Sequence, residues 1–392
     1  MVRSIRLAAA GAAAALVFGA ASAAQADPIK IGMVTTLSTG GGYLGEEVRN
    51  GFQLAIEHGG GKLGGVEVEL IVEDDARNPG TARQTVTRML RRENVDIMTG
   101  AVFSNVAMAS VPLALREGVF YISPNAGPAE LAGEQCHENY FNAAWQNDQL
   151  HEAMGQYMTD QGFERVYLLA PNYPAGRDAL NGFKRLFQGE IIAETYTQLG
   201  QTDFAAELSS IRAAEPDGIY FFLPGGDGIN FTRQYAQARV NERIPAYGPA
   251  FSFDNTLVNA VGKDALGIFN TSQWSLDMDN AVNQRFVADY KARYGNQPTL
   301  YASQGYDTAL LIAHALEATE GNVADQDAFR AALRSAEIDS TRGILRLGSN
   351  HHPIQNVYVR EVVEGDDGKL TNVLRGLVLE NHQDAYAVDC KM

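Results

Sequence analysis

Residues 29–57 begin with a short apolar run and continue into an amphipathic pattern. The run IKIGMV predicts a buried β-strand, because its apolar positions are nearly continuous. A loop of mostly small residues, TTLSTGGGYLG, follows, and a helix is expected from Glu46, with apolar Val48, Phe52 and Ile56 near helical spacing. A loop between a strand end and a helix start presents backbone N–H groups and a positive dipole end, so it favours an anionic ligand.

The alternation of strands and helices continues along the chain and then restarts. After strands at VEVELIVEDD, VDIMTG and VFYISP, the pattern begins again at RVYLLAP. Asn-Gly-Phe occurs at 50–52 and again at 181–183, in the first helix of each run. Near-continuous apolar strands alternating with helices predict an α/β fold with two similar lobes, each a doubly wound parallel sheet covered by helices on both faces.

No low-complexity linker separates the two lobes, and the later segments must be shared between them. These segments are a long helix, SQGYDTALLIAHALEATEG, and a strand-rich tail. We therefore expect a hinge with several short crossovers, near residues 142–146, 270–275 and 346–352. The predicted lobes are 27–143 with 274–346, and 144–273 with 347–392.

Residues 1–26 have the pattern of a secretory signal peptide. Arg3 and Arg6 precede an alanine-rich apolar segment, and Ala24-Gln25-Ala26 forms a cleavage site. A transmembrane anchor is the alternative, but the segment is weakly hydrophobic and Asp-Pro follows it directly. The mature chain is expected to begin at Asp27 and to lie outside the cytoplasm.

The charge balance excludes some classes of partner. The chain has 31 Lys and Arg against 47 Asp and Glu, and loss of Arg3 and Arg6 changes the net charge from −16 to −18. This excess of acid argues against nucleic acid and against an anionic membrane surface. No other apolar run approaches ~18 residues. The only cysteines are Cys136 and Cys390, and in an oxidising compartment one disulfide between them is the favoured interpretation, with two free thiols as the alternative.

Motifs for catalysis are weak. Residues 40–45 match the dinucleotide fingerprint G-x-G-x-x-G, but residues 35–39 separate it from the strand end, and an exported protein has no supply of nicotinamide cofactor. A glycine-rich loop close to some small ligand is the favoured interpretation, and an exported nucleotide-using enzyme is the distant alternative. G-x-S-x-G, H-E-x-x-H and C-x-x-C are missing, and His351-His352 is expected in a surface turn. We predict no catalytic residue, metal ligand or cofactor.

The candidate ligand-binding residues lie in loops at the carboxyl ends of the predicted strands, where open α/β sheets bind ligands. Small polar residues at helix starts suit a carboxylate, which their hydroxyl and N–H donors can hold. Aromatic residues near the crossovers indicate a partly aromatic cleft, although each one alone also fits core packing. The loop candidates are Ser38, Tyr43, Phe103, Ser104, Asn105, Asn125, Ala126, Gly127, Tyr173, Pro174, Gly226, Asp227, Phe251 and Ser252, and the aromatic residues near the crossovers are Trp145, Trp274 and Tyr301.

These segments together resemble the periplasmic solute-binding proteins of the type I, leucine/isoleucine/valine-binding class, which serve ABC importers. The resemblance covers residues 28–380. It implies a periplasmic monomer whose lobes close on a small carboxylate-bearing solute, an inner-membrane permease that recognises the closed form, and no catalysed reaction. A receptor's ligand-sensing domain shares this fold, and the lack of a transmembrane segment after Val378 disfavours it. The segments are IKIGMVTTLSTGGGYLGEEVRNGFQLAIE, VDIMTGAVFSNVAMASVPLA, FYISPNAG, NYPAGRDALNGF, GIYFFLPGGDGINFTRQYAQA and PTLYASQGYDTALLIAHAL.

The resemblance also implies roles for individual residues. Ser104 and residues 125–127 fall where the family holds the ligand's carboxylate, and Asp227 falls where amino-acid-binding members keep an acid for the ammonium group. The family's usual threonine is replaced by the 125–127 segment, and Asp227 lies in a glycine-rich loop expected to be flexible. These departures favour the branch that binds aromatic carboxylates such as benzoates and hydroxycinnamates; an aliphatic amino acid is the alternative. The residues expected to shape the pocket are Tyr43, Trp145, Tyr173 and Phe251.

Overall fold

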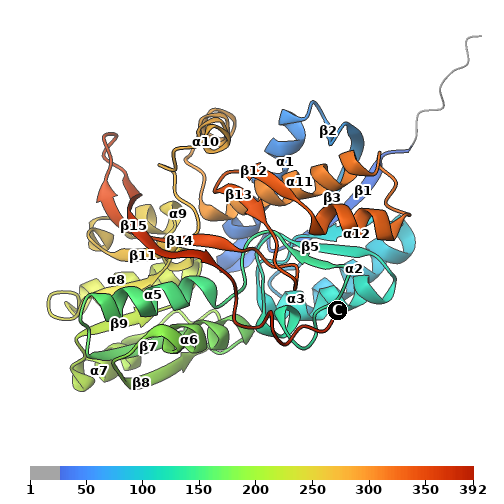
Figure 1. The fold of residues 1–392 in the computed structure, drawn as a ribbon. Helices are drawn as coiled ribbons and strands as arrows, with labels where there is room; N and C mark the ends of the chain where they lie inside the picture. Colours follow the sequence, from blue (N-terminus) through green and yellow to red (C-terminus); the bar gives the residue numbers. More distant parts are fainter. Residues whose placement is uncertain (1–26) are drawn as a thin grey trace, which may run out of the picture.

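The computed structural model describes residues 27–392 and arranges them as two α/β lobes (Figure 1). The predicted signal peptide, residues 1–26, lies outside the described residues. Each lobe is built on a mostly parallel sheet with helices packed against it. The predicted fold class is therefore confirmed.

The sheet of the first lobe has β1 near its centre. In spatial order its strands are β2 (Lys62–Leu63), β3 (Val66–Asp74), β1 (Ile29–Thr35), β4 (Ile97–Thr99), β5 (Phe120–Ser123) and β6 (Tyr140–Asn142). Neighbouring strands are parallel except for β2 and β3. The helices of this lobe are α1 (Gly42–His58), α2 (Pro79–Arg88), α3 (Ser104–Arg116), α4 (Ala129–Ala132), α11 (Leu300–Ala318) and α12 (Gln326–Arg334), with single turns η1 (Thr39–Gly41) and η2 (Met89–Glu93).

Helices α1 and α11 pack against each other at glycine positions. A Cβ atom on Gly51 would lie 1.9 Å from the carbonyl oxygen of Ala302, and one on Gly305 would lie 2.0 Å from that of Val48. Only glycine permits this approach. Helix α1 begins at Gly42, four residues before the predicted Glu46, because the glycine-rich segment itself turns into the helix.

The sheet of the second lobe ends in an antiparallel hairpin. Its strands are, in spatial order, β15 (Leu370–His382), β14 (Gln355–Glu364), β11 (Phe269–Ser272), β10 (Ala246–Pro249), β9 (Gly218–Phe221), β7 (Arg165–Pro171) and β8 (Glu190–Thr197). Strand β14 runs antiparallel to β11 and β15, and the other neighbours are parallel. The helices are α5 (Gln149–Asp160), α6 (Pro174–Leu186), α7 (Ala205–Ala214), α8 (Gly226–Gln237) and α9 (Asn255–Val261), with turns η3 (Ala250–Ser252) and η4 (Lys263–Ala265).

The chain passes between the lobes after β6, after β11 and before β14. The connecting elements include α10 (Ala281–Tyr294) and a two-stranded sheet of β12 (Glu337–Ser340) and β13 (Gly343–Arg346). Arg342 connects the passage after β6 with the start of β14 and with α11. Its guanidinium donates to the backbone carbonyls of Ala143 and Ala144, donates to Gln355 Oε1 at 2.8 Å, and pairs with Asp307 at 3.0 Å.

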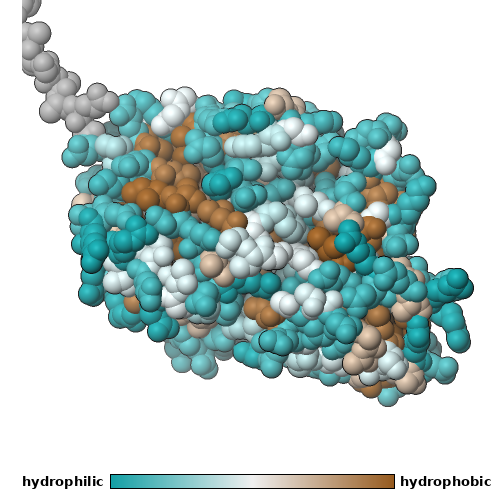
Figure 2. Space-filling view, turned by 180° about the vertical axis from the view of Figure 1, so that it is seen from behind, coloured by the Kyte–Doolittle hydropathy of each residue, from teal (hydrophilic) through white to brown (hydrophobic). Residues whose placement is uncertain are grey.

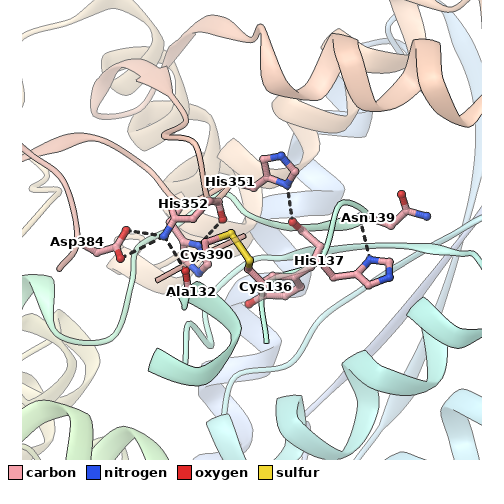
Figure 3. Close-up of a disulfide and its surroundings, with 10 residues drawn as sticks. Ala132, Cys136, His137, Asn139, His351, His352, Asp384 and Cys390 are labelled. Carbon is pink, nitrogen blue, oxygen red and sulfur yellow. Dashed lines mark hydrogen bonds between the residues drawn. A yellow bond between two sulfur atoms is a disulfide. The ribbon is translucent and has the colours of Figure 1, made fainter. Parts of the chain in front are cut away.

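A disulfide joins Cys136, which follows α4, to Cys390 at the end of the chain (Figure 3). It therefore attaches the segment after β15 of the second lobe to the first lobe. His351 and His352 lie beside this connection and are buried. The expected surface turn is wrong, because the His351 ring stacks on Phe141 with centroids 4.0 Å apart, and His351 Nδ1 contacts the carbonyl of Tyr140 at 3.0 Å.

Removing the disulfide is expected to destabilise the protein. The crosslinked residues are 254 positions apart, so the unfolded chain gains much conformational freedom when the bond is lost. The double variant Cys136→Ser/Cys390→Ser should lose about 2–4 kcal/mol of unfolding free energy in urea titrations. Reductant should lower the unfolding midpoint of the wild type and leave the double variant unchanged. Equal midpoints for the oxidised wild type and the double variant would contradict the prediction.

The surface of the described residues is largely polar. Figure 2 shows apolar residues gathered in separate patches, with hydrophilic residues around them. Within residues 27–392, no helix combines the length and the apolar character needed to cross a membrane.

Candidate functional site: a cavity between the lobes

The carboxyl ends of the parallel strands in the two sheets meet around a narrow cavity that residues of both lobes line. Segments after β4 and β5 contribute from the first lobe, and segments after β7 and β9 contribute from the second. Ligands of open α/β sheets bind at such strand ends, near the point where the strand order reverses. The wall consists of Leu44, Val102, Phe103, Ser104, Asn125, Trp145, Asn147, Tyr173, Ala175, Phe222, Pro224, Phe251 and Tyr301.

Aromatic rings form most of this wall. Of the described residues that line the cavity, six are aromatic, three are neutral and polar, and none is charged. The rings of Trp145 and Phe251 have centroids 4.2 Å apart, and Phe251 is 5.5 Å from Tyr301 of the first lobe. Phe103 of the first lobe is likewise 6.3 Å from Tyr173 of the second. The two lobes therefore complete one aromatic enclosure, which suits a flat apolar group.

Ser104 supplies a polar point in the wall at the start of α3. The N–H groups of a helix's first turn have no partner within the helix, and they carry its positive dipole end. Asn147 Nδ2 donates to Ser104 Oγ at 3.1 Å, and Asn147 Oδ1 accepts from the N–H of Gly127 at 3.0 Å. Since Ser104 Oγ accepts from Asn147, its own proton is available for a ligand. Ser104 and the first turn of α3, which we call the Ser104 corner, can hold an anion without a charged side chain.

Two tyrosine hydroxyls provide further donors. Among the described residues, the hydroxyls of Tyr173 and Tyr301 have no hydrogen-bond partner, and both side chains line the cavity. Burial is the main cause that raises the pKa of each hydroxyl well above its usual range. Both therefore stay protonated and can donate to a ligand.

Asn125 fixes the ring of Trp145. Its backbone carbonyl accepts from Trp145 Nε1 at 2.7 Å, and its side-chain Nδ2 donates to Gln304 Oε1 at 2.6 Å. The indole is thus held by the segment after β5, although it belongs to the passage between the lobes.

The structure brings many of the sequence candidates together. Those in the cavity wall are Phe103, Ser104, Asn125, Trp145, Tyr173, Phe251 and Tyr301. Residues that sequence reasoning did not select are also there: Leu44, Val102, Asn147, Ala175, Phe222 and Pro224. Whether each one contacts a ligand stays a prediction.

Other candidates lie outside the wall, and three of them have polar groups that bind elsewhere. The Tyr43 hydroxyl donates to Asp254 Oδ2 at 2.9 Å, across the lobes. Ser252 Oγ accepts from the N–H of Leu223 at 2.8 Å, and Trp274 Nε1 donates to Asn283 Oδ1 at 2.7 Å. Ser38, Asn105, Ala126, Gly127, Pro174 and Gly226 are also outside the wall.

Asp227 is likewise absent from the wall. It lies in the first turn of α8, not in the flexible loop expected from the glycines around it, and its carboxylate favours that helix end. Asp227 Oδ2 accepts from Arg77 Nη2 at 3.2 Å and from the N–H of Gly200 at 2.8 Å. The protein itself therefore supplies the positive partner that was expected from a ligand.

The glycine-rich segment at residues 40–45 serves packing. A Cβ on Gly41 would lie 2.9 Å from the ring of Phe103, and one on Gly45 would lie 2.0 Å from the carbonyl oxygen of Thr36. These contacts explain the glycines without a nucleotide. Within residues 27–392, no group of three or more His, Cys, Asp or Glu is placed to hold a metal ion.

Glu47 makes the stability of this region depend on pH. It is buried in α1, and burial raises its pKa from 4.5 to about 7, although Thr299 donates two hydrogen bonds to it. The folded state therefore binds a proton more tightly than the unfolded state does. The contribution of Glu47 protonation to the unfolding free energy is present at low pH and is lost as the pH rises through about 7.

Replacing Glu47 with glutamine should remove this loss. From about pH 5 to pH 8, the unfolding free energy of Glu47→Gln should rise by about 3 kcal/mol relative to the wild type. Asp254, whose charge also raises the pKa of Glu47, is present in both proteins. Urea unfolding across this pH range measures the difference, with Glu46→Gln on the exposed face of α1 as the control. A difference that does not change with pH would contradict the assignment.

Comparison with known proteins gives one consistent family. Residues 28–369 match the family model described as periplasmic binding protein. A curated relative, Leu/Ile/Val-binding protein homolog 6 of Brucella melitensis biotype 1, is 27% identical over 364 residues, covering 90% of this chain and 92% of the relative. A solute-binding protein of an ABC transporter from R. palustris, solved with benzoate, is 33% identical with a TM-score of 0.88, covering 93% of this chain and 100% of that one. Another, from Rhodopseudomonas palustris BisB5 with 3,4-dihydroxy benzoic acid, is 29% identical with a TM-score of 0.86, covering 91% and 99%.

Proposed function

Because the chain belongs to the periplasmic binding protein family, we propose that it captures a small aromatic carboxylate in the cavity between its lobes and delivers it to the permease of an ABC importer. The proposed solutes are aromatic acids of the benzoate and hydroxycinnamate type. The place of action is the periplasm.

The observation that carries this proposal is the composition of the cavity wall. Six aromatic side chains surround the cavity, and no lining residue among those described is charged. A flat ring gains contact with several aromatic faces and edges in such a space. Relatives solved with benzoate and with 3,4-dihydroxy benzoic acid support the same ligand class.

The carboxylate would bind at the Ser104 corner. A buried carboxylate must recover the hydrogen bonds that it loses when it leaves water. The donors for this purpose are the Ser104 hydroxyl, the N–H groups of Ser104 and Asn105 at the start of α3, and the hydroxyls of Tyr173 and Tyr301. Hydrogen bonds to an ionised group are the strong ones, so a few neutral donors suffice.

A branched-chain or other amino acid is the second candidate ligand, and the name of the curated relative favours it. Its ammonium group would need an acceptor of negative charge in the cavity. Asp227, the residue expected to fill this role, is already paired with Arg77. This pairing favours a ligand without an ammonium group.

Closure of the lobes would couple binding to transport. The wall is divided between the lobes, so a ligand gains its full set of contacts only when they meet. A ligand then shifts the open–closed equilibrium by its higher affinity for the closed state. Equal radii of gyration with and without saturating ligand, measured by small-angle X-ray scattering, would contradict closure.

A ligand screen tests the proposal. The mature protein is heated with benzoate, 4-hydroxybenzoate, 4-hydroxycinnamate, leucine, valine or phenylalanine, and unfolding is recorded. A ligand at ~100 Kd adds ~2.7 kcal/mol of stability, a shift of several degrees or less in Tm. We expect shifts with the aromatic acids alone. Shifts with amino acids and none with aromatic acids would overturn the proposal.

Replacing Ser104 with alanine should weaken binding of the aromatic acid. The variant loses one hydrogen bond to a buried charge, which corresponds to about 1–3 kcal/mol of binding free energy. Isothermal titration measures the change. Ser110→Ala is the matched control, because Ser110 is a buried serine of the same helix outside the cavity wall. Unchanged affinity in Ser104→Ala would place the carboxylate elsewhere.

A further inference from the structure

Arg77 and Asp227 form an ion pair between the lobes. Arg77 follows β3 of the first lobe, and Asp227 lies in the first turn of α8 of the second. The distance from Nη2 to Oδ2 is 3.2 Å, and the two side chains are only 10% and 5% exposed. Gly200 donates its N–H to the same carboxylate oxygen at 2.8 Å. Asp227 thus has a partner from each lobe, and the one from the first lobe carries the compensating charge.

The ion pair lies directly behind the cavity wall. The guanidinium carbon of Arg77 is 4.4 Å from the ring centroid of Phe103, which is a cation–π distance. The other side of this wall includes Tyr173, and both Arg77 and Asp227 are close enough to act on the Tyr173 hydroxyl electrostatically. The electrostatic potential of the two charges therefore extends into the cavity, although neither side chain lines it.

The lobes are also in close contact at this point. A Cβ atom on Gly225 or Gly226 would lie 3.2 or 3.1 Å from the carbonyl oxygen of Gly40, in the other lobe. When the lobes separate, Arg77 and Asp227 move apart and both can be hydrated. When they close, each loses water and needs the other, because a single buried charge is costly.

We propose that Arg77 determines the ligand's charge class, by neutralising Asp227 behind the cavity wall so that the closed protein accepts an aromatic carboxylate and rejects the corresponding amino acid. Without Arg77, closure would bury the Asp227 carboxylate behind the cavity wall with no compensating positive charge, since Gly200 donates only a neutral N–H. An anionic ligand would then be repelled, and an ammonium group would be attracted. This inference rests on the proposed function and adds to it the residue that excludes zwitterions.

The test compares benzoate with L-phenylglycine, which carries an ammonium group on an added carbon between the ring and the carboxylate, by isothermal titration. Phenylacetate, which has the added carbon without the ammonium group, is the control for size. The variants are Arg77→Met, which keeps an apolar side chain over Phe103, Arg77→Lys, which keeps the charge, and the double variant Arg77→Met/Asp227→Asn. In Arg77→Met, benzoate affinity should fall about tenfold or more, since one partner of a buried charge pair is left alone. The affinity ratio of benzoate to phenylglycine should fall by at least about tenfold.

The double variant distinguishes the effect of the unpaired charge on affinity from the effect of altered packing. It lacks both charges, so benzoate affinity and the ratio should return to within about threefold of the wild type, and Arg77→Lys should retain the ratio. Thermal unfolding confirms that each variant is folded. A ratio unchanged in Arg77→Met, or one that stays shifted in the double variant, would overturn the role of Arg77 while benzoate binding by the wild type upholds the proposed function. A wild type that binds amino acids instead of benzoate would overturn both.

Discussion

Replacing Trp145 with alanine should reduce affinity for the aromatic acid by about 100-fold or more, the effect of removing a central aromatic anchor. The indole lines the cavity, is only 2% exposed, and packs on Phe251 with centroids 4.2 Å apart. Its Nε1 donates to the carbonyl of Asn125, in the segment after β5 of the first lobe. Alanine would remove both a wall of the cavity and this link between the passage and the first lobe. Isothermal titration with benzoate measures the loss.

Trp274 provides the matched control, because the chain contains only two tryptophans. Trp274 is 1% exposed and its Nε1 also has a partner, yet it does not line the cavity. Trp→Ala at either position should lower the unfolding free energy by about 3–5 kcal/mol, and only Trp145→Ala should lower affinity. Trp145→Phe serves where the alanine variant does not fold. Equal losses of affinity at both positions would mean that the effect comes from general destabilisation.

The sequence predicts the sheets well because buried parallel strands leave a strong signal of continuous apolar residues. A continuous apolar pattern does not show which side of a strand faces the site, because both sides are apolar. In β9 and the residues after it, Ile219, Phe221 and Leu223 pack into one core cluster, whereas Tyr220 and Phe222 pack into the other, which adjoins the cavity. The alternation of strand residues gives this division. It could have selected Phe222, which was missed among the apolar neighbours.

Contacts between distant residues carry no such signal. Asn147 joins Gly127, Ser104 and Asp178, yet in the sequence it is one polar residue in a loop. Asp227 and Arg77 are 150 positions apart, and nothing near either residue indicates the other. The predicted ammonium-binding role of Asp227 depended on what else would be close to it. Placement of loops at strand ends could be predicted from the sequence, but the pairing of side chains across the two lobes could not.

The second large effect is expected at Arg342, where the variant Arg342→Met should lower the unfolding free energy by about 3–5 kcal/mol. The side chain of its partner Asp307 is fully buried, and the pair is 3.0 Å apart. Removing one partner leaves an uncompensated buried charge. The guanidinium also binds the backbone carbonyls of Ala143 and Ala144, so the passage after β6 loses donors. Urea unfolding followed by circular dichroism measures the change.

Arg346→Met is the control for Arg342→Met, because Arg346 lies on the nearby strand β13 and its guanidinium donates to Asn381 Oδ1 in an exposed setting. Its loss should be within about 0.5 kcal/mol. Adding Asp307→Asn to Arg342→Met should recover part of the stability, since the unpaired charge is then gone. A loss that stays the same in this double variant would mean that the hydrogen bonds to the passage after β6, and not the ion pair, carry the effect. Arg342 would then hold the hinge through its backbone contacts alone.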